Sequence, residues 1–539
     1  MASLALSYWQ IHQTRPSNSK NLSPVSASWL FCSASLTLVA QQFLILIFYS
    51  ALVILLGVDG PVGFRGLSLL LDNDYVFLFR SSASVTGKLR TLLARVAPTE
   101  RQKLFALTLA GGALCGLAAV GFHLTIRTLE NHLIRNALRA PGTTWIWLTL
   151  LVPTAGGLLC GILLDRFVPG AAGSGIPQVK VAYATESGRV PLRDAIGKFI
   201  IGSLQVGSGA SLGREGPTVQ ICAGVTSALA KIGNLSRASQ RRMLPVGAAA
   251  AIAAAFNAPI SAVTFTVEEI VGDLDQTMLT GVIVASAIAA AVERSVLGVH
   301  PVFTVTAVYS ADRMSSLLLY AALGIIAGMV SVIFTDSLLA LRGWFKKLEL
   351  IPRWAHPAVG GLVTGALAVI AMLWLRSDGV TGGGYEKLNR ALAGELLFKT
   401  LLGLCVLKLV ATVFSYSSGG AGGIFAPALF IGGMLGGAVG YLDVLLLHHP
   451  AQDVGAFALV GMGAAFAGIV RAPITSVLII FEMTGSYGLI LPLMVANMTA
   501  YGLARHWRHT PIYDALLEQD GVRLPHGQRR LHAEDATAG

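Results

Sequence analysis

Two stretches of this 539-residue sequence share one pattern. Residues 198–221 read KFIIGSLQVGSGASLGREGPTVQI, and residues 408–431 read KLVATVFSYSSGGAGGIFAPALFI. In a single register, the identical pairs include Lys198 with Lys408, Ser208 with Ser418, Gly209 with Gly419, Gly213 with Gly423 and Pro217 with Pro427. The agreement predicts that one structural unit occurs twice in the chain.

A second match lies farther along both copies. Residues 258–261 (Ala-Pro-Ile-Ser) correspond to 472–475 (Ala-Pro-Ile-Thr), and Glu268 corresponds to Glu482. Each copy combines Gly-rich turns with a proline, and proline favours the first turn of a helix. Broken helices at matching positions of two halves are typical of transporters with a site near the membrane midplane. Helix N-termini with unpaired N–H groups favour an anion at that site.

Composition places the chain in a membrane. Hydrophobic residues make up 54% of the sequence and charged residues only 12%, about half the charged share of a soluble protein. Apolar stretches of about 20 residues, long enough to cross the hydrocarbon core as helices, recur along the chain. They include 104–126, 144–165, 277–298, 316–340, 356–376 and 395–415. We therefore expect an all-α polytopic membrane protein.

The net charge of +11 comes from basic residues outside the apolar stretches. They gather before the first span of the core and after the last one, as Lys88, Arg90, Arg95, Arg101, Lys103, Arg505, Arg508, Arg523, Arg529 and Arg530. Cytoplasmic segments of membrane proteins are rich in lysine and arginine. Both ends of the core are therefore expected on the cytoplasmic side of the inner or plasma membrane, with an even number of crossings. The same distribution argues against nucleic acid as the partner.

Residues 1–95 are interpreted separately from the core. A leader with Ser, Pro and Asn precedes an apolar run, 29–57, which is longer than the roughly 7–15 residues of a signal-peptide core. An extra span and an extension outside the core both fit this run. The expected division is this N-terminal extension, a transmembrane domain over 96–514 and a cytoplasmic tail over 515–539. That tail is too short for a further folded domain, such as a nucleotide-sensing regulatory pair.

The sequence does not favour an intramembrane enzyme, a metal centre or a cofactor. It contains no HExxH motif and no Cys/His set at the spacing of metal ligands. The cysteines, which are Cys32, Cys115, Cys160, Cys222 and Cys405, all lie in apolar segments. We expect them to be buried free thiols.

Three Gly/Pro segments stand out within the duplicated core. They are Gly-Ser-Gly-Ile-Pro at 173–177, Gly-Arg-Glu-Gly-Pro at 213–217 and Gly-Gly-Ile-Phe-Ala-Pro at 422–427. In this chain order they resemble the three signature motifs of the CLC family of chloride channels and proton/chloride antiporters, and the similarity extends over residues 100–515. The resemblance implies two inverted-topology repeats with broken helices around a central anion site, and a homodimer with a pore in each subunit.

The resemblance also implies a chloride site. The hydroxyls of Ser174 and Tyr513, with the backbone N–H groups of Ile424 and Phe425, would coordinate the ion. Taken alone, Ser174 could equally be a helix N-cap, and Tyr513 could be an interfacial aromatic residue near a span end. Because Ser174, Pro217 and Tyr513 are all retained, chloride is the expected anion, with bromide and nitrate tolerated.

Glu215 is the most informative single residue. A carboxylate inside an apolar segment is costly and usually functional. At a Gly/Pro helix start it could occupy an anion site made of N–H groups when charged, and leave that site when protonated. The resemblance identifies it as the external gating glutamate. The alternative is a charge on a surface loop at the beginning of a helix.

Glu268 and Glu269 lie in the apolar run 258–270. Adjacent residues of a helix point about 100° apart, so the two carboxylates are expected to face different surroundings. The resemblance assigns internal proton transfer to Glu269, a position that is usually non-acidic in channels. The alternative is a pair that merely ends a helix at the cytoplasmic interface. Glu269 therefore favours exchange of chloride for protons over a passive, voltage- or pH-gated chloride channel of the same fold.

Overall fold

The structure is a computed structural model. It describes Ala97, Phe303 and residues 99–185, 188–272, 276–298, 314–447, 453–485 and 487–524. The N-terminal extension and residues 525–539 of the tail lie outside the described residues. Within the described ranges every named element is a helix.

Eight described helices are long and apolar enough to cross a membrane, by length and composition. The six stretches named from the sequence coincide with such helices. The main helices of these spans are α5 (Glu100–His132) continuing into α6 (Ile134–Leu138), α7 (Thr144–Arg166), α13 (Gln276–Leu297), α14 (Met314–Lys347), α15 (His356–Leu375), α17 (Phe398–Ser417), α18 (Phe425–Leu447) and α21 (Ile490–Trp507).

Further helices complete both halves. Residues 167–275 contain α8 (Ile176–Ala184), α9 (Leu192–Gly207), α10 (Glu215–Ile232), α11 (Arg237–Phe256), α12 (Pro259–Phe265) and the π-helical turn η2 (Thr266–Val271). The second half adds α16 (Tyr385–Leu392), α19 (Asp453–Val470), α20 (Pro473–Thr484) and α22 (Ile512–Gln519). Prolines lie in the first turns of α8, α10, α12, α18 and α20, as predicted from the Gly/Pro segments.

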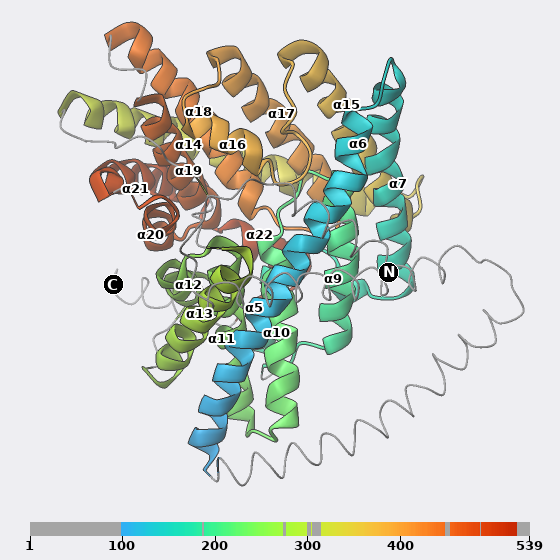
Figure 1. The fold of residues 1–539 in the computed structure, drawn as a ribbon, viewed down its shortest axis with the longest axis vertical. Coiled ribbons are helices and arrows are strands. Elements are labelled where there is room, and N and C mark those ends of the chain that lie inside the picture. Colours follow the sequence, from blue (N-terminus) through green and yellow to red (C-terminus); the bar gives the residue numbers. More distant parts are fainter. Residues whose placement is uncertain are drawn as a thin grey trace, which may run out of the picture. The chain divides into compact units, whose positions relative to one another are not determined.

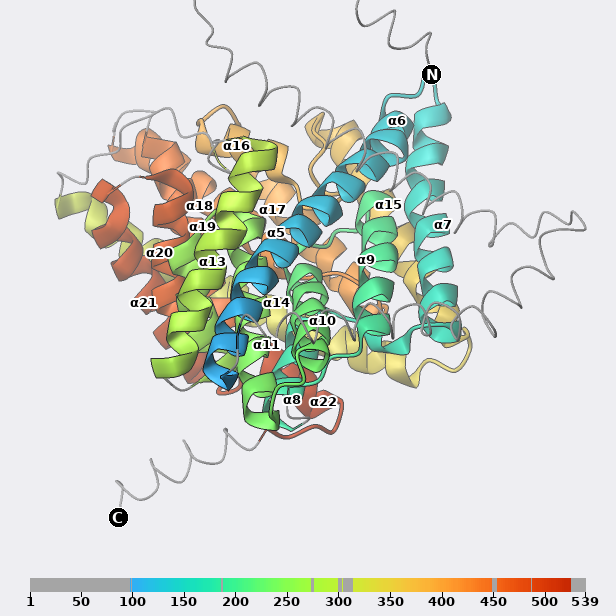
Figure 2. The ribbon, with the colours of Figure 1, turned by 60° about the horizontal axis from the view of Figure 1, so that its bottom comes forward.

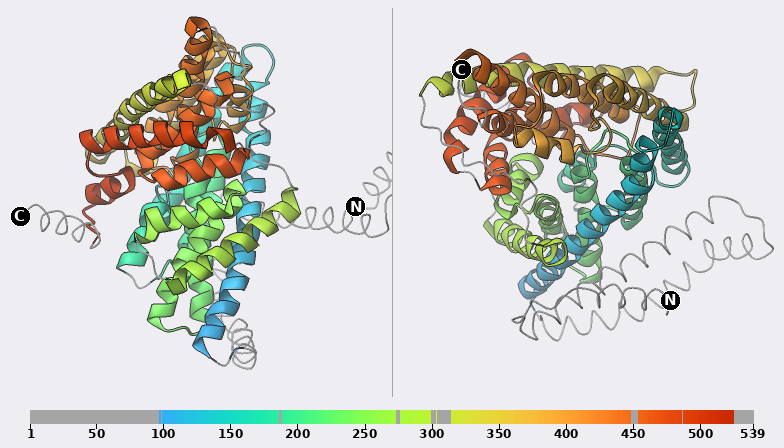
Figure 3. Two further views of the ribbon diagram at one scale, coloured as in Figure 1. Left: turned by 90° about the vertical axis from the view of Figure 1, so that its left-hand side faces the viewer. Right: turned by 45° about the horizontal axis from the view of Figure 1, so that its top comes forward.

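The two halves form inverted-topology repeats that meet at the centre. Helices α8–α13 lie on one side of this part of the molecule and α17–α21 on the other (Figures 1 and 3). Helix α5 runs obliquely across α9, α10 and α13 (Figure 2), and α7 packs along α15. That last contact is reciprocal: a Cβ on Gly157 would overlap the Pro357 carbonyl, and a Cβ on Gly361 would overlap the Pro153 carbonyl. Small residues thus allow close helix packing in both directions.

The cysteines of the described residues are buried and free, as predicted from their apolar surroundings. They are Cys115, Cys160, Cys222 and Cys405. Each thiol lies within 3.5–3.6 Å of a backbone carbonyl oxygen on another helix. They serve as small packing residues between helices.

Candidate functional site

The two halves touch through their backbones next to Glu215. The Gly213 N–H donates to the Gly423 carbonyl at 2.7 Å, and the Gly423 N–H donates to the Gly213 carbonyl at 2.8 Å. This antiparallel bridge joins the second and third Gly/Pro segments. A Cβ at position 213 would overlap the Glu215 carboxylate in its present place and lie 3.0 Å from the Ala426 nitrogen, so glycine allows this close approach. The bridge therefore places the start of α10 against the start of α18.

The Glu215 carboxylate is fully buried at this contact. Its Oε2 accepts a hydrogen bond of 3.3 Å from the Ala426 N–H, in the first turn of α18. Its Oε1 accepts a hydrogen bond from the Tyr385 hydroxyl at the start of α16, and the Arg214 Nε lies 4.0 Å away. The surface-loop alternative for Glu215 is thereby wrong. A first-half carboxylate occupies the N-terminus of a second-half helix, where anions are favoured.

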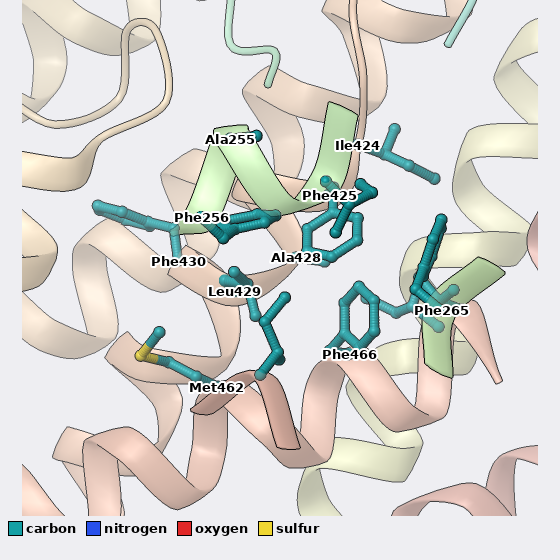
Figure 4. Packing of buried hydrophobic residues seen from close by; sticks show 14 of the residues in the cluster. Ala255, Phe256, Phe265, Ile424, Phe425, Ala428, Leu429, Phe430, Met462 and Phe466 are labelled. Atoms are coloured by element: carbon teal, nitrogen blue, oxygen red, sulfur yellow. The ribbon is translucent and has the colours of Figure 1, made fainter. Parts of the chain in front are cut away.

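The start of α18 also leaves the N–H groups of Ile424 and Phe425 available. The first intrahelical bond is the one from Ala428 N–H to the Ile424 carbonyl, so both amides precede the helical ladder. The Phe425 ring fixes this end of the helix in the core (Figure 4). Its centroid lies 4.9 Å from that of Phe256, 5.7 Å from that of Phe265 and 4.3 Å from that of Phe466.

Ser174 and Tyr513 present two buried hydroxyls that make no hydrogen bond within the described part of the protein. The N-cap alternative for Ser174 is wrong, because Gly175 is the N-cap of α8 and its N–H is bonded to the Gln178 side chain. The interfacial alternative for Tyr513 is also wrong, since the residue is 0% exposed. A buried hydroxyl without a partner costs about 1–3 kcal/mol, so the pair indicates a place for a ligand.

Glu269 is buried and paired with a cation. Its Oε1 accepts from the Lys180 Nζ at 2.7 Å, and the same nitrogen donates to Asp514 Oδ1 at 2.5 Å. Glu269 is 6% exposed and Lys180 is 8% exposed. Glu269 thus lies in the last turn of its helix, as the alternative expected, but its carboxylate is buried and paired. The turn that carries it, η2, is π-helical, a conformation often found at functional sites.

Glu268 points elsewhere, as predicted from its adjacency to Glu269. It accepts hydrogen bonds from the N–H groups of Ile474 and Thr475, at the start of α20, at 3.1 and 2.8 Å. Glu482, its partner in the repeat, accepts from the N–H groups of Ile260 and Ser261, at the start of α12, at 3.0 and 2.6 Å. The two carboxylates thus cap each other's half of the molecule.

Three residues of these sites were not singled out in the sequence. Tyr385 follows three glycines, 382–384, in the place that Ile176 has after Gly173-Ser174-Gly175, so a comparison of these two loops would have found it. Lys180 had a weaker signal, a lysine inside a helix of the first Gly/Pro segment. Asp514 had none beyond its position next to Tyr513.

Together these groups place a buried carboxylate, helix N-terminal N–H groups and two buried hydroxyls where the two halves meet. The family model described as voltage gated chloride channel matches residues 156–505. The "H(+)/Cl(-) exchange transporter ClcA" of Cronobacter sakazakii is 34% identical over 454 residues, which cover 81% of this chain and 93% of the relative. That of Salmonella typhimurium is 32% identical over 452 residues, with the same shares. The chain therefore belongs to the CLC family.

Solved structures agree with this assignment. A slow cyanobacterial Cl−/H+ antiporter matches with a TM-score of 0.70 and 28% identity, over 78% of this chain and 98% of that one. A CLC-type fluoride/proton antiporter matches with a TM-score of 0.62 and 23% identity, over 76% and 97%. The second likeness shows the shared fold alone.

Proposed function

We propose that this chain exchanges chloride for protons across a membrane, with Glu215 as the gate and Glu269 as the internal proton-transfer site. The position of the Glu215 carboxylate carries the proposal. It accepts from the Ala426 N–H at the start of α18, so it competes with chloride for the donors of one site. Protonation removes its charge and weakens its hold there. A single side chain thus carries the proton and opens the path.

The chloride ion would sit between the two halves. Ser174 and Tyr513 offer hydroxyls with no other partner, and Ile424 and Phe425 offer N–H groups at a helix N-terminus. All four residues are 0% exposed. Burial strengthens each donor, because water does not compete for it.

Glu269 favours exchange over a passive chloride channel, the second candidate. A buried carboxylate is costly, and a channel that only conducts chloride needs no second proton site. The relatives are named exchange transporters, and the 28%-identical structure is a Cl−/H+ antiporter. These names support the proposal of proton/chloride exchange. The chain is a transporter and has no proposed catalytic residue.

The assembly, membrane and orientation that we propose are those expected from the sequence. The core at 96–514 would work as a homodimer in a lipid bilayer, the inner or plasma membrane, with both its ends and the tail at 515–539 in the cytoplasm. Chloride is the expected anion, with bromide and nitrate tolerated. The ion gradients supply all the energy, so exchange needs no cofactor.

Paired flux in liposomes tests the exchange. Under an outward chloride gradient, the wild-type protein should move protons inward as chloride leaves, with chloride followed by electrode and protons by external pH. Glu215→Gln mimics the protonated acid but carries no proton. This variant should keep chloride flux and lose proton flux. Chloride movement by the wild type without counter-moving protons would leave the channel as the function.

Calorimetric chloride titration tests the anion site. Tyr513→Ala removes one hydroxyl donor to a charged ligand, which is worth about 1.5–3 kcal/mol. Chloride affinity should fall by about 10–100-fold. An unchanged affinity in the folded variant would remove Tyr513 from the site.

A further inference from the structure

Three titratable side chains from three separate elements meet on the Glu269 side of the molecule. Lys180 comes from α8, Glu269 from η2 and Asp514 from α22. The Lys180 Nζ lies between the carboxylates, 2.7 Å from Glu269 Oε1 and 2.5 Å from Asp514 Oδ1. The first distance is that of a charge-assisted hydrogen bond, and the second is shorter still. The three groups therefore form one continuous hydrogen-bonded chain.

The solvent exposure of the three side chains differs from one end of this hydrogen-bonded series to the other. The Asp514 side chain is 37% exposed, whereas the side chains of Lys180 and Glu269 are 10% and 5% exposed. Among the three, Asp514 is the group that water reaches. Glu269 lies at the buried end, and every hydrogen bond between it and Asp514 passes through one nitrogen.

We propose that Asp514 and Lys180 relay protons from solution to Glu269. The Lys180 ammonium gives one N–H proton to the Glu269 carboxylate, and the neutral amine takes a proton from the Asp514 carboxyl. Asp514 has received that proton from water. Lys180 ends with the charge it began with, Asp514 is again a carboxylate, and one proton has moved from water to Glu269.

The surroundings of Glu269 suit this role. The other titratable groups that face it are Glu268 and Tyr513. Glu268 is engaged by the N–H groups of Ile474 and Thr475, and Tyr513 belongs to the proposed anion site. Lys180 is thus the cation that hydrogen-bonds Glu269 directly. An ammonium has three donors on a flexible stem, so it can serve two carboxylates in turn.

The relay rests on the proposed function, because a proton path to Glu269 has a use only in an exchanger. Proton and chloride fluxes in liposomes are therefore measured for the wild type before the variants. The decisive variant is Lys180→Arg, since arginine keeps the positive charge and both ion pairs but does not give up a proton in proteins. A relay predicts at least an about tenfold loss of proton flux with chloride flux within about twofold of wild type. A lysine that only positions Glu269 predicts a normal proton-to-chloride ratio.

Asp514→Asn tests the entry point independently. It should lower the proton-to-chloride ratio while calorimetric chloride affinity stays normal, because Tyr513 is untouched. The matched control is Glu518→Gln, an exposed carboxylate on the same helix, which should leave the ratio unchanged. A wild-type ratio in either Lys180→Arg or Asp514→Asn overturns the relay and leaves the exchanger intact. A wild type without proton flux overturns both.

Discussion

The two halves of the molecule hold matching loops in the same way. In the first half, the buried Lys198 Nζ donates to the carbonyls of Ala171, Ala172 and Gly173, ahead of α8. In the second half, the buried Lys408 Nζ donates to three carbonyls in the same order ahead of α16, those of Val380, Thr381 and Gly382. Each helix then begins after a glycine with positive φ, Gly175 or Gly384. The duplicated residues are therefore those that build the framework.

The halves differ at the residues that carry the chemistry. Ser174, with its free hydroxyl, corresponds to Gly383 in the second loop. Tyr385, which donates to Glu215, corresponds to Ile176 in the first. In the alignment of the long repeat, Glu215 corresponds to Phe425. The first is a carboxylate, and the second is a ring packed in the core.

The two adjacent glutamates, Glu268 and Glu269, also differ in whether the other half has a matching residue. Glu268 has a counterpart, Glu482, and both cap helices reciprocally. In the alignment that pairs Glu268 with Glu482, Glu269 corresponds to Met483. That methionine is 1% exposed and lies in the core. A carboxylate that recurs in both halves is structural, and a carboxylate that occurs in one half is a candidate for proton transfer. This rule separates neighbours that composition alone treats alike.

The largest expected effect comes from removing either loop-holding lysine. Lys198→Met or Lys408→Met keeps the apolar stem but leaves three buried carbonyls without a donor, and each costs about 1–3 kcal/mol. Both variants should lose several degrees of thermal stability, measured by the melting of the detergent-solubilised protein. The exposed Lys347→Met is the control. If one lysine proved dispensable and the other essential, the two loops would not be equivalent.

The reciprocal caps should show an intermediate effect. Glu268→Gln and Glu482→Gln each keep an acceptor oxygen but lose the charge opposite a helix N-terminus, so each should cost about 1–2 kcal/mol of stability. The losses should be similar, and the proton-to-chloride ratio should remain normal in both. Thermal melting beside the exposed Glu349→Gln measures the first, and paired flux measures the second. Unequal losses would break the symmetry of the caps.

Tyr385→Phe should have the smallest effect. It removes the one hydroxyl that holds Glu215 Oε1 and leaves the Ala426 N–H in place. Since the lost bond stabilises the seated carboxylate, protonation should open the gate more readily. The pH at which chloride flux is half-maximal should rise by about one unit, the equivalent of about 1.4 kcal/mol. Tyr487→Phe, exposed by 78%, is the control, and an unmoved pH profile would show that Tyr385 does not hold the gate.

Much of this architecture was predictable from the sequence because it is local or repeated. The apolar spans follow from composition, and the helix starts follow from the prolines at 177, 217 and 427. Glu215 stood out since a charge in an apolar segment is costly. The sequence did not predict the hydrogen-bond partners of Glu215 and Glu269. A comparison of the two loops would have pointed to Tyr385, and Lys180 had a weaker signal. The contacts that these residues and Asp514 make still join distant segments, and such contacts leave no pattern in spacing or hydropathy.

Glu268 and Glu269 can be compared in one experiment. Proton and chloride fluxes would be measured together in liposomes for the wild type, Glu269→Gln and Glu268→Gln. We expect coupled exchange in the wild type and in Glu268→Gln, and chloride flux with little proton movement in Glu269→Gln. Coupled exchange that survives in Glu269→Gln and disappears in Glu268→Gln would contradict this expectation, because the shared carboxylate would then carry the proton.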